Sequence, residues 1–407
     1  MSGTPRKPSG LLTRRGVLRG ALCASTALAL SACADNKFDL GDFGKFGSTS
    51  PTAPPAPGPG AQIGQGQVRV GLILPLSGPS GAGVGTSLKN AAEMALSDFK
   101  NPDLQLLVKD DGGTPQGAQA GAQAAINEGA EIVLGPLFAQ SVRAVSQVTR
   151  ARNIPVIAFS TDASVASQGV YLLSFLPETD VRRIVEYAAS RGKRSFAALI
   201  PENAYGAVVE AAFQQEVPRH GGRIVVLQKY PLDPSKIAEP VHAVAQAATQ
   251  VDSVFIPDNA DSVVQLVQTL NADHVNLKRL QLLGTGVWDD PHIFSTPALH
   301  GALYPGPDPN AFRTFSAQYR ARYGQDPVRA ATLAYDAVAL VAALVKTQGP
   351  QRFSEAVLTN SSGFSGKDGL FRFRADGTNE RGLAVLRVGP TGPQVVAPPP
   401  RAFGPAA

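Results

Sequence analysis

The chain has 407 residues, 43% hydrophobic and 17% charged, which is long enough to bury more than one hydrophobic core. Its 37 lysines and arginines exceed its 32 aspartates and glutamates, but five of the basic residues fall within positions 1–32, which contain no acidic residue. The rest of the chain is therefore balanced in charge, which argues against a nucleic acid or another polyanion as partner.

The first residues predict an export signal. An apolar run at residues 21–30 follows five basic residues: Arg6, Lys7, Arg14, Arg15 and Arg19. The run is shorter than the about 20 residues that a membrane-crossing helix needs. Residues 13–19 also resemble the twin-arginine export motif, although Val17 and Arg19 depart from it. Export by the general route and export by the twin-arginine route both stay open.

The signal ends in Leu30-Ser31-Ala32-Cys33, which resembles the bacterial lipobox. The resemblance implies cleavage after residue 32 and a diacylglyceryl thioether on Cys33; alternatively, Cys33 is only a small residue near a cleavage site. Ala34 stands where an aspartate retains lipoproteins at the inner membrane, so we expect an outer-membrane anchor facing the periplasm. Cys23 is the only other cysteine, so the folded domain has no disulfide and no catalytic thiolate.

The two ends of the exported chain have the composition of spacers. Residues 33–66 are rich in proline and glycine, and we expect them to hold a globular domain away from the membrane. Residues 389–407, with three consecutive prolines at 398–400, predict a flexible tail.

Short apolar runs alternate with alanine-rich helical segments along the rest of the chain. The predicted strands are 68–74, 104–109, 131–134, 155–159, 171–175, 195–200, 224–229, 253–256 and 280–283. The predicted helices include 87–99, 116–128, 142–151, 180–191 and 205–217. Continuous apolar strands in βαβα order indicate an α/β fold with doubly wound, mostly parallel sheets, and the length favours two lobes.

Ligands of such sheets bind beyond the carboxyl ends of the strands. Residues 76–85 are glycine-rich, and Asp110 and Asp111 end the second strand, but the glycine spacing differs from a dinucleotide fingerprint. A nucleotide-dependent oxidoreductase is therefore a weak third hypothesis. The five histidines show no metal-ligand spacing, and no nucleophile elbow is present. We expect no metal, no cofactor and no enzymatic activity.

Several segments in register resemble the type I periplasmic binding proteins, in the Leu/Ile/Val-binding branch. They are residues 70–78, 108–115, 135–137, 154–161 and 203–206. The resemblance implies two lobes, 67–176 plus 305–365 and 177–304 plus 366–388. It implies three hinge crossings, near Leu176, near Tyr304 and Pro305, and near residues 366–368.

In amino-acid-binding members, the ligand is held by small hydroxyl residues and amides, an aromatic residue and a late acidic residue. Carried over to this sequence, the candidate residues are Ser77, Gly78, Phe138, Ala139, Gln140, Ser141, Ser160, Thr161, Asp162, Tyr205, Asn259 and Trp288. Gly286 occupies the place of the usual acid, and Asp289 replaces it only if the loop shifts. A buried ammonium without a carboxylate is costly.

The lipobox, the spacer and residues 134–138 and 157–162 look most like the penicillin-binding-protein activators, lipoproteins that stimulate a peptidoglycan synthase. We therefore expect a non-enzymatic activator or scaffold with such a synthase as partner. The alternative is a receptor that delivers amino acids or another small solute to an ABC permease.

Overall fold

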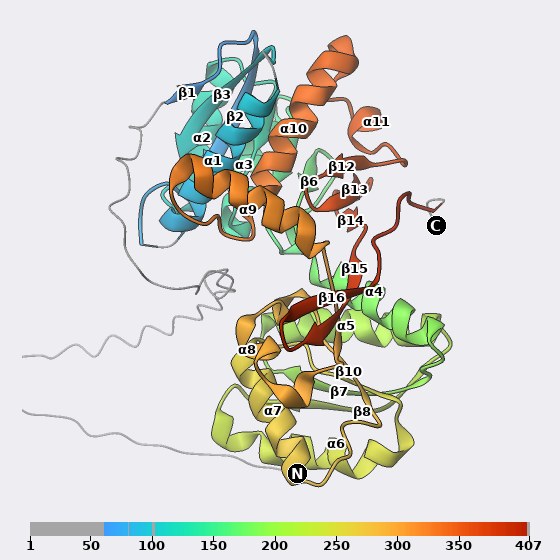
Figure 1. The fold of residues 1–407 in the computed structure, drawn as a ribbon. Coiled ribbons are helices and arrows are strands. Elements are labelled where there is room, and N and C mark those ends of the chain that lie inside the picture. The colour runs from blue at the N-terminus through green and yellow to red at the C-terminus, as the bar shows by residue number, and fades with distance from the viewer. Residues whose placement is uncertain (1–60, 80, 100–101, 405–407) are drawn as a thin grey trace, which may run out of the picture. The chain divides into compact units, whose positions relative to one another are not determined.

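The computed structural model describes residues 61–79, 81–99 and 102–404 (Figure 1). The predicted signal, the lipidation site at Cys33 and most of the spacer lie outside these residues. None of the described helices is long and apolar enough to cross a membrane.

The first lobe is built on a six-stranded sheet with the order β1-β3-β2-β4-β5-β6. The strands are β1 (Gln62–Ile63), β2 (Val68–Leu74), β3 (Leu104–Asp110), β4 (Ile132–Leu134), β5 (Val156–Ala158) and β6 (Val170–Leu172). The short β1 pairs antiparallel with β3, and the other strands pair parallel. Residues 62–63 of the predicted spacer therefore belong to the sheet, because their backbone groups complete its open edge.

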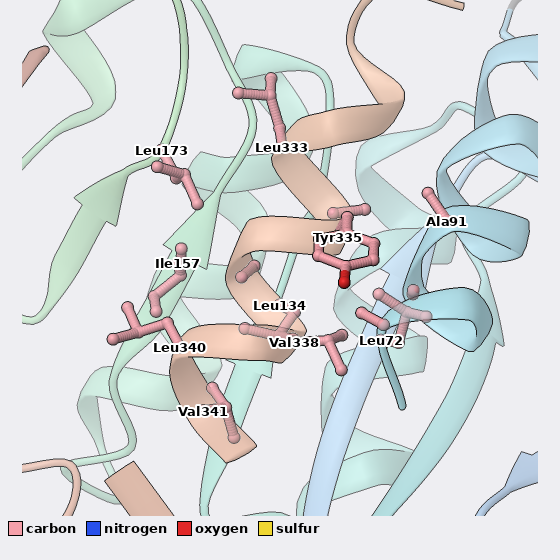
Figure 2. Packing of buried hydrophobic residues seen from close by; sticks show 14 of the residues in the cluster. Leu72, Ala91, Leu134, Ile157, Leu173, Leu333, Tyr335, Val338, Leu340 and Val341 are labelled. Atoms are coloured by element: carbon pink, nitrogen blue, oxygen red, sulfur yellow. The ribbon is translucent and has the colours of Figure 1, made fainter. Parts of the chain in front are cut away.

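Helices enclose this sheet, and α10 provides the largest share of the core. The helices are α1 (Ala82–Asp98), α2 (Pro115–Asn127), α3 (Ala139–Arg150), α9 (Pro309–Tyr323), α10 (Ala331–Thr347) and α11 (Glu355–Leu358). Leu72, Leu134 and Ile157 from the strands lie beside Val338 and Leu340 of α10 (Figure 2). A segment remote in sequence thus completes the first core.

The second lobe contains a seven-stranded sheet with the order β16-β15-β11-β10-β9-β7-β8. Its strands are β7 (Ser195–Pro201), β8 (Arg223–Tyr230), β9 (Ser253–Phe255), β10 (Gln281–Leu283), β11 (Leu303–Gly306), β15 (Ala384–Gly389) and β16 (Gly392–Ala397). Its helices are α4 (Pro177–Ser190), α5 (Ala204–Arg219), α6 (Ala238–Ala247), α7 (Ala260–Ala272) and α8 (Pro291–Phe294). β7 to β11 pair parallel, whereas β15 and β16 run antiparallel.

The third crossing between the lobes lies later in the chain than predicted, because a small antiparallel sheet precedes it. β12 (Phe364–Gly366), β13 (Gly369–Phe373) and β14 (Asn379–Arg381) form this sheet. Phe371 and Phe373 of β13 are buried in the first core, although residues 366–373 were predicted for the second lobe. The chain reaches the second sheet only at β15, so the crossing lies at residues 382–383 and not at 366–368.

The predicted flexible tail is also wrong for its described part. Residues 392–397 form β16, which pairs antiparallel with β15. Beyond it, residues 398–404, here called the C-terminal strap, return to the small sheet, where the guanidinium carbon of Arg372 lies 4.6 Å from the ring centre of Phe403. Val396 and Ala397 pack against a core of the second lobe, while Val395 is exposed, as in an edge strand. Two consecutive β-branched valines favour the strand despite the nearby prolines.

The mostly parallel α/β architecture confirms the predicted fold class, and β2 to β10 lie where apolar runs predicted strands. α1 begins at Ala82, earlier than expected, and includes Gly83 and Gly85 of the glycine-rich segment. A side chain at Gly85 would place its Cβ 2.0 Å from the carbonyl oxygen of Pro75. This glycine is therefore required for close packing of helix on strand.

Candidate ligand-binding site

The loop after β2 is held by a neighbouring carboxylate. Asp110 Oδ1 accepts hydrogen bonds from the backbone N–H groups of Leu76 at 2.9 Å, Ser77 at 3.1 Å and Gly112 at 2.8 Å. Partial burial opposes ionisation of Asp110, but these hydrogen bonds and one from the Ser77 hydroxyl hold its pKa below the usual value. Ser77 and Gly78 are exposed and Gly78 has a φ of 87°. Asp110 thus positions the loop through its Oδ1.

Four candidate ligand residues follow β4, and they differ in burial. Phe138 and Ala139 are half-buried, Gln140 is exposed, and Ser141 is fully buried in the first turn of α3. Within the described residues, the Ser141 hydroxyl has no hydrogen-bond partner. Phe138 packs against the first core, where it fills the space beside Gly81. Ala139 and Gln140 are therefore the members of this group that a ligand reaches most easily.

The loop after β5 is stabilised by its own side chains. Ser160 is buried, and its hydroxyl accepts a hydrogen bond of 3.1 Å from the N–H of Asp162. Asp162 caps the following turn by accepting 2.9 Å from the N–H of Ser164, and lies 3.4 Å from Arg143. Thr161 is half-buried between them. The loop therefore offers Thr161 at its surface, because both carboxylate oxygens of Asp162 already have partners.

In the second lobe, aromatic hydroxyls at the strand ends bond to neighbouring polar groups. Tyr205, in the first turn of α5, has its hydroxyl 2.6 Å from Thr285 Oγ1, and both residues are buried. Tyr230, the last residue of β8, donates a hydrogen bond of 2.5 Å to Asp258 Oδ2. Asn259 donates to the other oxygen of Asp258 and caps α7 by accepting from the N–H of Ser262. Tyr205 and Asn259 thus lie at the carboxyl edge of the second sheet, as expected, and each is hydrogen-bonded to residues of the second lobe.

Trp288, proposed as a ligand contact, lies in the second core. Its side chain is fully buried, and its indole N–H donates 3.0 Å to the carbonyl oxygen of Ile256. A Cβ on Gly284 would come within 2.1 Å of the indole ring. The ring therefore packs flat on the backbone after β10 and stabilises the loop without facing a ligand.

A carboxylate comes close to Gly286, where the family resemblance implied an acid. Asp180, in the first turn of α4, accepts a hydrogen bond of 2.8 Å from the Gly286 N–H through Oδ2. Burial, with a smaller contribution from the charge of Glu178, raises the pKa of Asp180 to about 7. The pKa of Glu178 is itself raised, chiefly by burial.

Asp289 is a third acid at this edge. Burial raises its pKa, while the positive charge of Arg329 and a hydrogen bond of 3.1 Å from the Tyr304 hydroxyl act in the opposite direction. Glu178, Asp180 and Asp289 together form an acidic edge that is incompletely neutralised by the protein. Such a group stabilises a bound cation, including an ammonium group.

The sequence reasoning missed Glu178, Asp180, Asp258, Thr285 and Arg329. Asp180 belongs to a helix that follows the first crossing, and its approach to Gly286 joins residues 106 positions apart. No local pattern predicts that contact. Asp258 comes just after the predicted strand 253–256, so the rule that ligands bind beyond strand ends could have identified it.

Comparisons with known proteins agree with this architecture. Two solved structures share the fold: a protein of Rhodospirillum rubrum assigned to branched-chain amino acid ABC transporters, and an ABC transporter substrate-binding protein of Desulfitobacterium hafniense in complex with Leu. The first has a TM-score of 0.73 at 19% identity and the second 0.61 at 18%, each over 81% of this chain and 99% of the other.

Two curated relatives match shorter parts. An uncharacterised protein of Rickettsia prowazekii is 22% identical over 216 residues, 53% of this chain and 56% of that protein. The penicillin-binding protein activator LpoA of Enterobacter is 30% identical over 131 residues, 32% of this chain and 18% of the activator. The chain thus spans about half of the first relative and less than a fifth of the second.

The model of one family, described as periplasmic binding protein, matches residues 67–393. The match covers both lobes, all three crossings and β15. The chain belongs to the periplasmic binding protein family.

Proposed function

We propose that the protein is a non-enzymatic lipoprotein of the cell envelope that activates a peptidoglycan synthase by binding it. The lipid on Cys33 anchors it to the outer membrane, and residues 34–60 hold the domain on the periplasmic side. The 30% identity to an LpoA activator over 131 residues supports this role.

The observation that carries the proposal is the internal bonding of groups expected to hold a solute. Of the expected contacts, Tyr205 bonds to Thr285, and Trp288 bonds to the Ile256 backbone inside the core. At the neighbouring strand end, Tyr230 bonds to Asp258. A solute that took these hydrogen bonds would leave the present partners unsatisfied, at about 1–3 kcal/mol for each buried group. This arrangement favours a domain that presents a fixed surface to a protein partner.

Side-chain contacts also connect residues near the three crossings. The guanidinium of Arg329 lies 4.4 Å from the ring centre of Phe312 and 4.9 Å from that of Phe175, and Arg381 lies 4.6 Å from Phe175. Phe175, Phe312 and Arg381 each lie within a few residues of a different crossing. The C-terminal strap runs from β16 of the second sheet to Arg372 of the small sheet, and hinge closure would have to rearrange this contact, which supports a scaffold over a receptor.

The test is direct binding to a purified bifunctional penicillin-binding protein, without added solute. We expect capture of the synthase by the immobilised mature protein and faster glycan polymerisation in its presence. Absence of both effects, together with a thermal shift on addition of leucine, isoleucine or valine, would overturn the proposal.

A second candidate is a receptor for a solute with an amino group, and the acidic edge favours it. Glu178, Asp180 and Asp289 have raised pKa values, so the ammonium group of a ligand would offset the cost of ionising these buried carboxyl groups. Such a receptor raises its melting temperature with ligand as RT ln(1 + [L]/Kd). Under this alternative, leucine produces the shift in the parent protein and a much smaller shift in Asp180→Asn.

A further inference from the structure

A cavity of about 210 Å³ lies beside the third crossing. Thr179, Arg182 and Arg183 of α4 line one side, and Glu380 of β14 lines another. Leu383 and Phe403 provide the apolar wall, the latter from the C-terminal strap. The cavity is therefore bounded by a helix of the second lobe, by the small sheet and by the strap.

Arg182 lines this cavity with unused hydrogen-bond donors. Its Nε lies 4.0 Å from Glu216 Oε1 and its Nη1 lies 3.8 Å from Glu380 Oε1, both beyond hydrogen-bond length. Among the described residues it donates no hydrogen bond, although a guanidinium carries five N–H donors. Burial lowers the pKa of Arg182, and the nearby charge of Arg374 lowers it further. The charge of this side chain is thus incompletely balanced.

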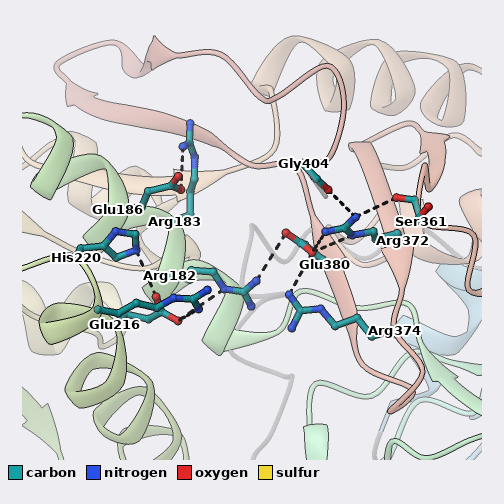
Figure 3. Close-up of polar contacts among 11 residues, drawn as sticks. Arg182, Arg183, Glu186, Glu216, His220, Ser361, Arg372, Arg374, Glu380 and Gly404 are labelled. Atoms are coloured by element: carbon teal, nitrogen blue, oxygen red, sulfur yellow. Dashed lines mark hydrogen bonds and ion pairs between the residues drawn. The ribbon is translucent and has the colours of Figure 1, made fainter. Parts of the chain in front are cut away.

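The nearby glutamates are already engaged by other residues. Figure 3 shows Glu380 between Arg182, Arg372 and Arg374. Arg372 donates to Glu380 at 2.8 and 3.0 Å and Arg374 at 3.1 Å, and these hydrogen bonds hold the pKa of Glu380 below its usual value despite its burial. Glu216 lies 3.5 Å from both Arg219 and His220. Neither carboxylate is free to neutralise Arg182 fully.

The surrounding charges leave a positive excess. Arg182, Arg183, Arg219, Arg372 and Arg374 stand against Glu178, Glu186, Glu216 and Glu380, an excess of one positive charge with His220 neutral. Glu186 is about half exposed and lies 3.5 Å from Arg183. An oxyanion that entered the cavity would meet guanidinium groups with unused donors.

The apolar wall restricts the kind of anion. Phe403 is held in place because Arg372 lies 4.6 Å from its ring centre and donates 3.1 Å to the carbonyl oxygen of Gly404. A phosphate ion would lose water against Phe403 and Leu383 without gaining a polar partner there. A carboxylate with an apolar body places its charge at Arg182 and its carbon atoms against this wall.

We propose that this cavity binds a small organic carboxylate, held by Arg182 and covered by the C-terminal strap. The site lies beside the acidic edge on the same helix, α4, and adds to the proposed function. Because elements of both lobes line it, an occupied cavity stabilises one arrangement of the lobes and couples to whatever the strand-end surface binds.

The test is calorimetric titration of the full mature protein with benzoate as probe, and in parallel with inorganic phosphate. We expect the parent protein to bind benzoate and Arg182→Gln to bind it about tenfold or more weakly, because a charge-assisted hydrogen bond is lost. The control Arg191→Gln, an exposed arginine at the end of the same helix, should bind as the parent does.

A further variant keeps the test decisive if Arg182→Gln does not fold. Ala402→Glu alters an exposed strap residue that lines the cavity, and its carboxylate should abolish benzoate binding without affecting folding, as far-ultraviolet circular dichroism checks. The proposal is overturned by absence of benzoate binding in the parent, by phosphate binding of equal strength, or by normal binding in Ala402→Glu.

Discussion

The carboxylate of Asp180 accepts a hydrogen bond of 2.8 Å from the backbone N–H of Gly286. A Cβ at position 286 would come within 3.0 Å of the same carboxylate oxygen, so the glycine leaves room for the acid from α4. Although residue 286 itself has no side chain, the acidic character of this edge is retained. The charge now belongs to the helix that follows the first crossing.

Asp180 gives the protein a pH-dependent stability. Burial raises its folded-state pKa from 3.8 to about 7, so the folded protein binds more protons than the unfolded chain between these values. Stability therefore falls as the pH rises through this window. Asp180→Asn removes the effect. A rise of about three in pKa corresponds to about 4 kcal/mol, so we expect the variant to be more stable than the parent at pH 8 by up to about 4 kcal/mol, with a much smaller difference at pH 4.

Urea unfolding at the two pH values measures this difference. A smaller slope should remain in the variant, because burial also raises the pKa of Asp111 to about 6. An unchanged pH dependence in Asp180→Asn would show that the folded carboxylate is already ionised near neutrality, contrary to our expectation.

The ion pair of Arg329 and Asp368 should contribute strongly to stability. Asp368 is buried, and Arg329 donates to it at 2.9 and 2.8 Å, which holds the pKa of Asp368 low despite burial. Arg329→Met leaves the carboxylate uncompensated, so we expect a loss of about 3–5 kcal/mol in the free energy of unfolding. Urea denaturation measures it.

The exposed pair of Arg320 and Asp326 provides the matched control for this prediction. Both side chains are more than half exposed, so Arg320→Met should cost less than about 1 kcal/mol. The double variant Arg329→Met/Asp368→Leu should recover part of the loss. Equal effects of the two single arginine substitutions would contradict the interpretation.

Gly284 should tolerate no side chain. A Cβ there would lie 2.1 Å from the ring of Trp288, which is fully buried. We expect Gly284→Ala to lower stability by about 1–3 kcal/mol through overpacking. Trp288 is the single tryptophan, so its fluorescence spectrum should shift as well.

Gly83→Ala is the control for Gly284→Ala, because nothing lies within 4 Å of its Cβ position in α1. It should be neutral or stabilising by up to about 1 kcal/mol. If Gly284→Ala behaved in the same way, the ring would have to move freely, and its role as a fixed core residue would be wrong.

Membrane attachment should depend on Cys33. Without the thiol no lipid can be attached, so we expect Cys33→Ala to leave the membrane fraction when the cells are fractionated. Cys23→Ala, inside the signal, should partition as the parent does. A Cys33→Ala variant that stayed wholly with the membranes would rule out the lipid as its anchor.

The amino-acid sequence by itself determined the α/β class and the strands β2 to β10, because buried parallel strands require continuous apolar runs such as 68–74 and 195–201. It also singled out the family segments at residues 70–78 and 203–206. These features depend on local composition and spacing, which a single chain displays directly.

Only the tertiary structure decided which side chains meet. It placed Trp288 in the core, brought Asp180 to Gly286, and returned residues 392–397 to the second sheet as β16. It also kept Phe371 and Phe373 in the first core, which moved the third crossing. These outcomes depend on contacts between residues far apart in the chain, whose free energies outweigh the local preferences that the sequence displays.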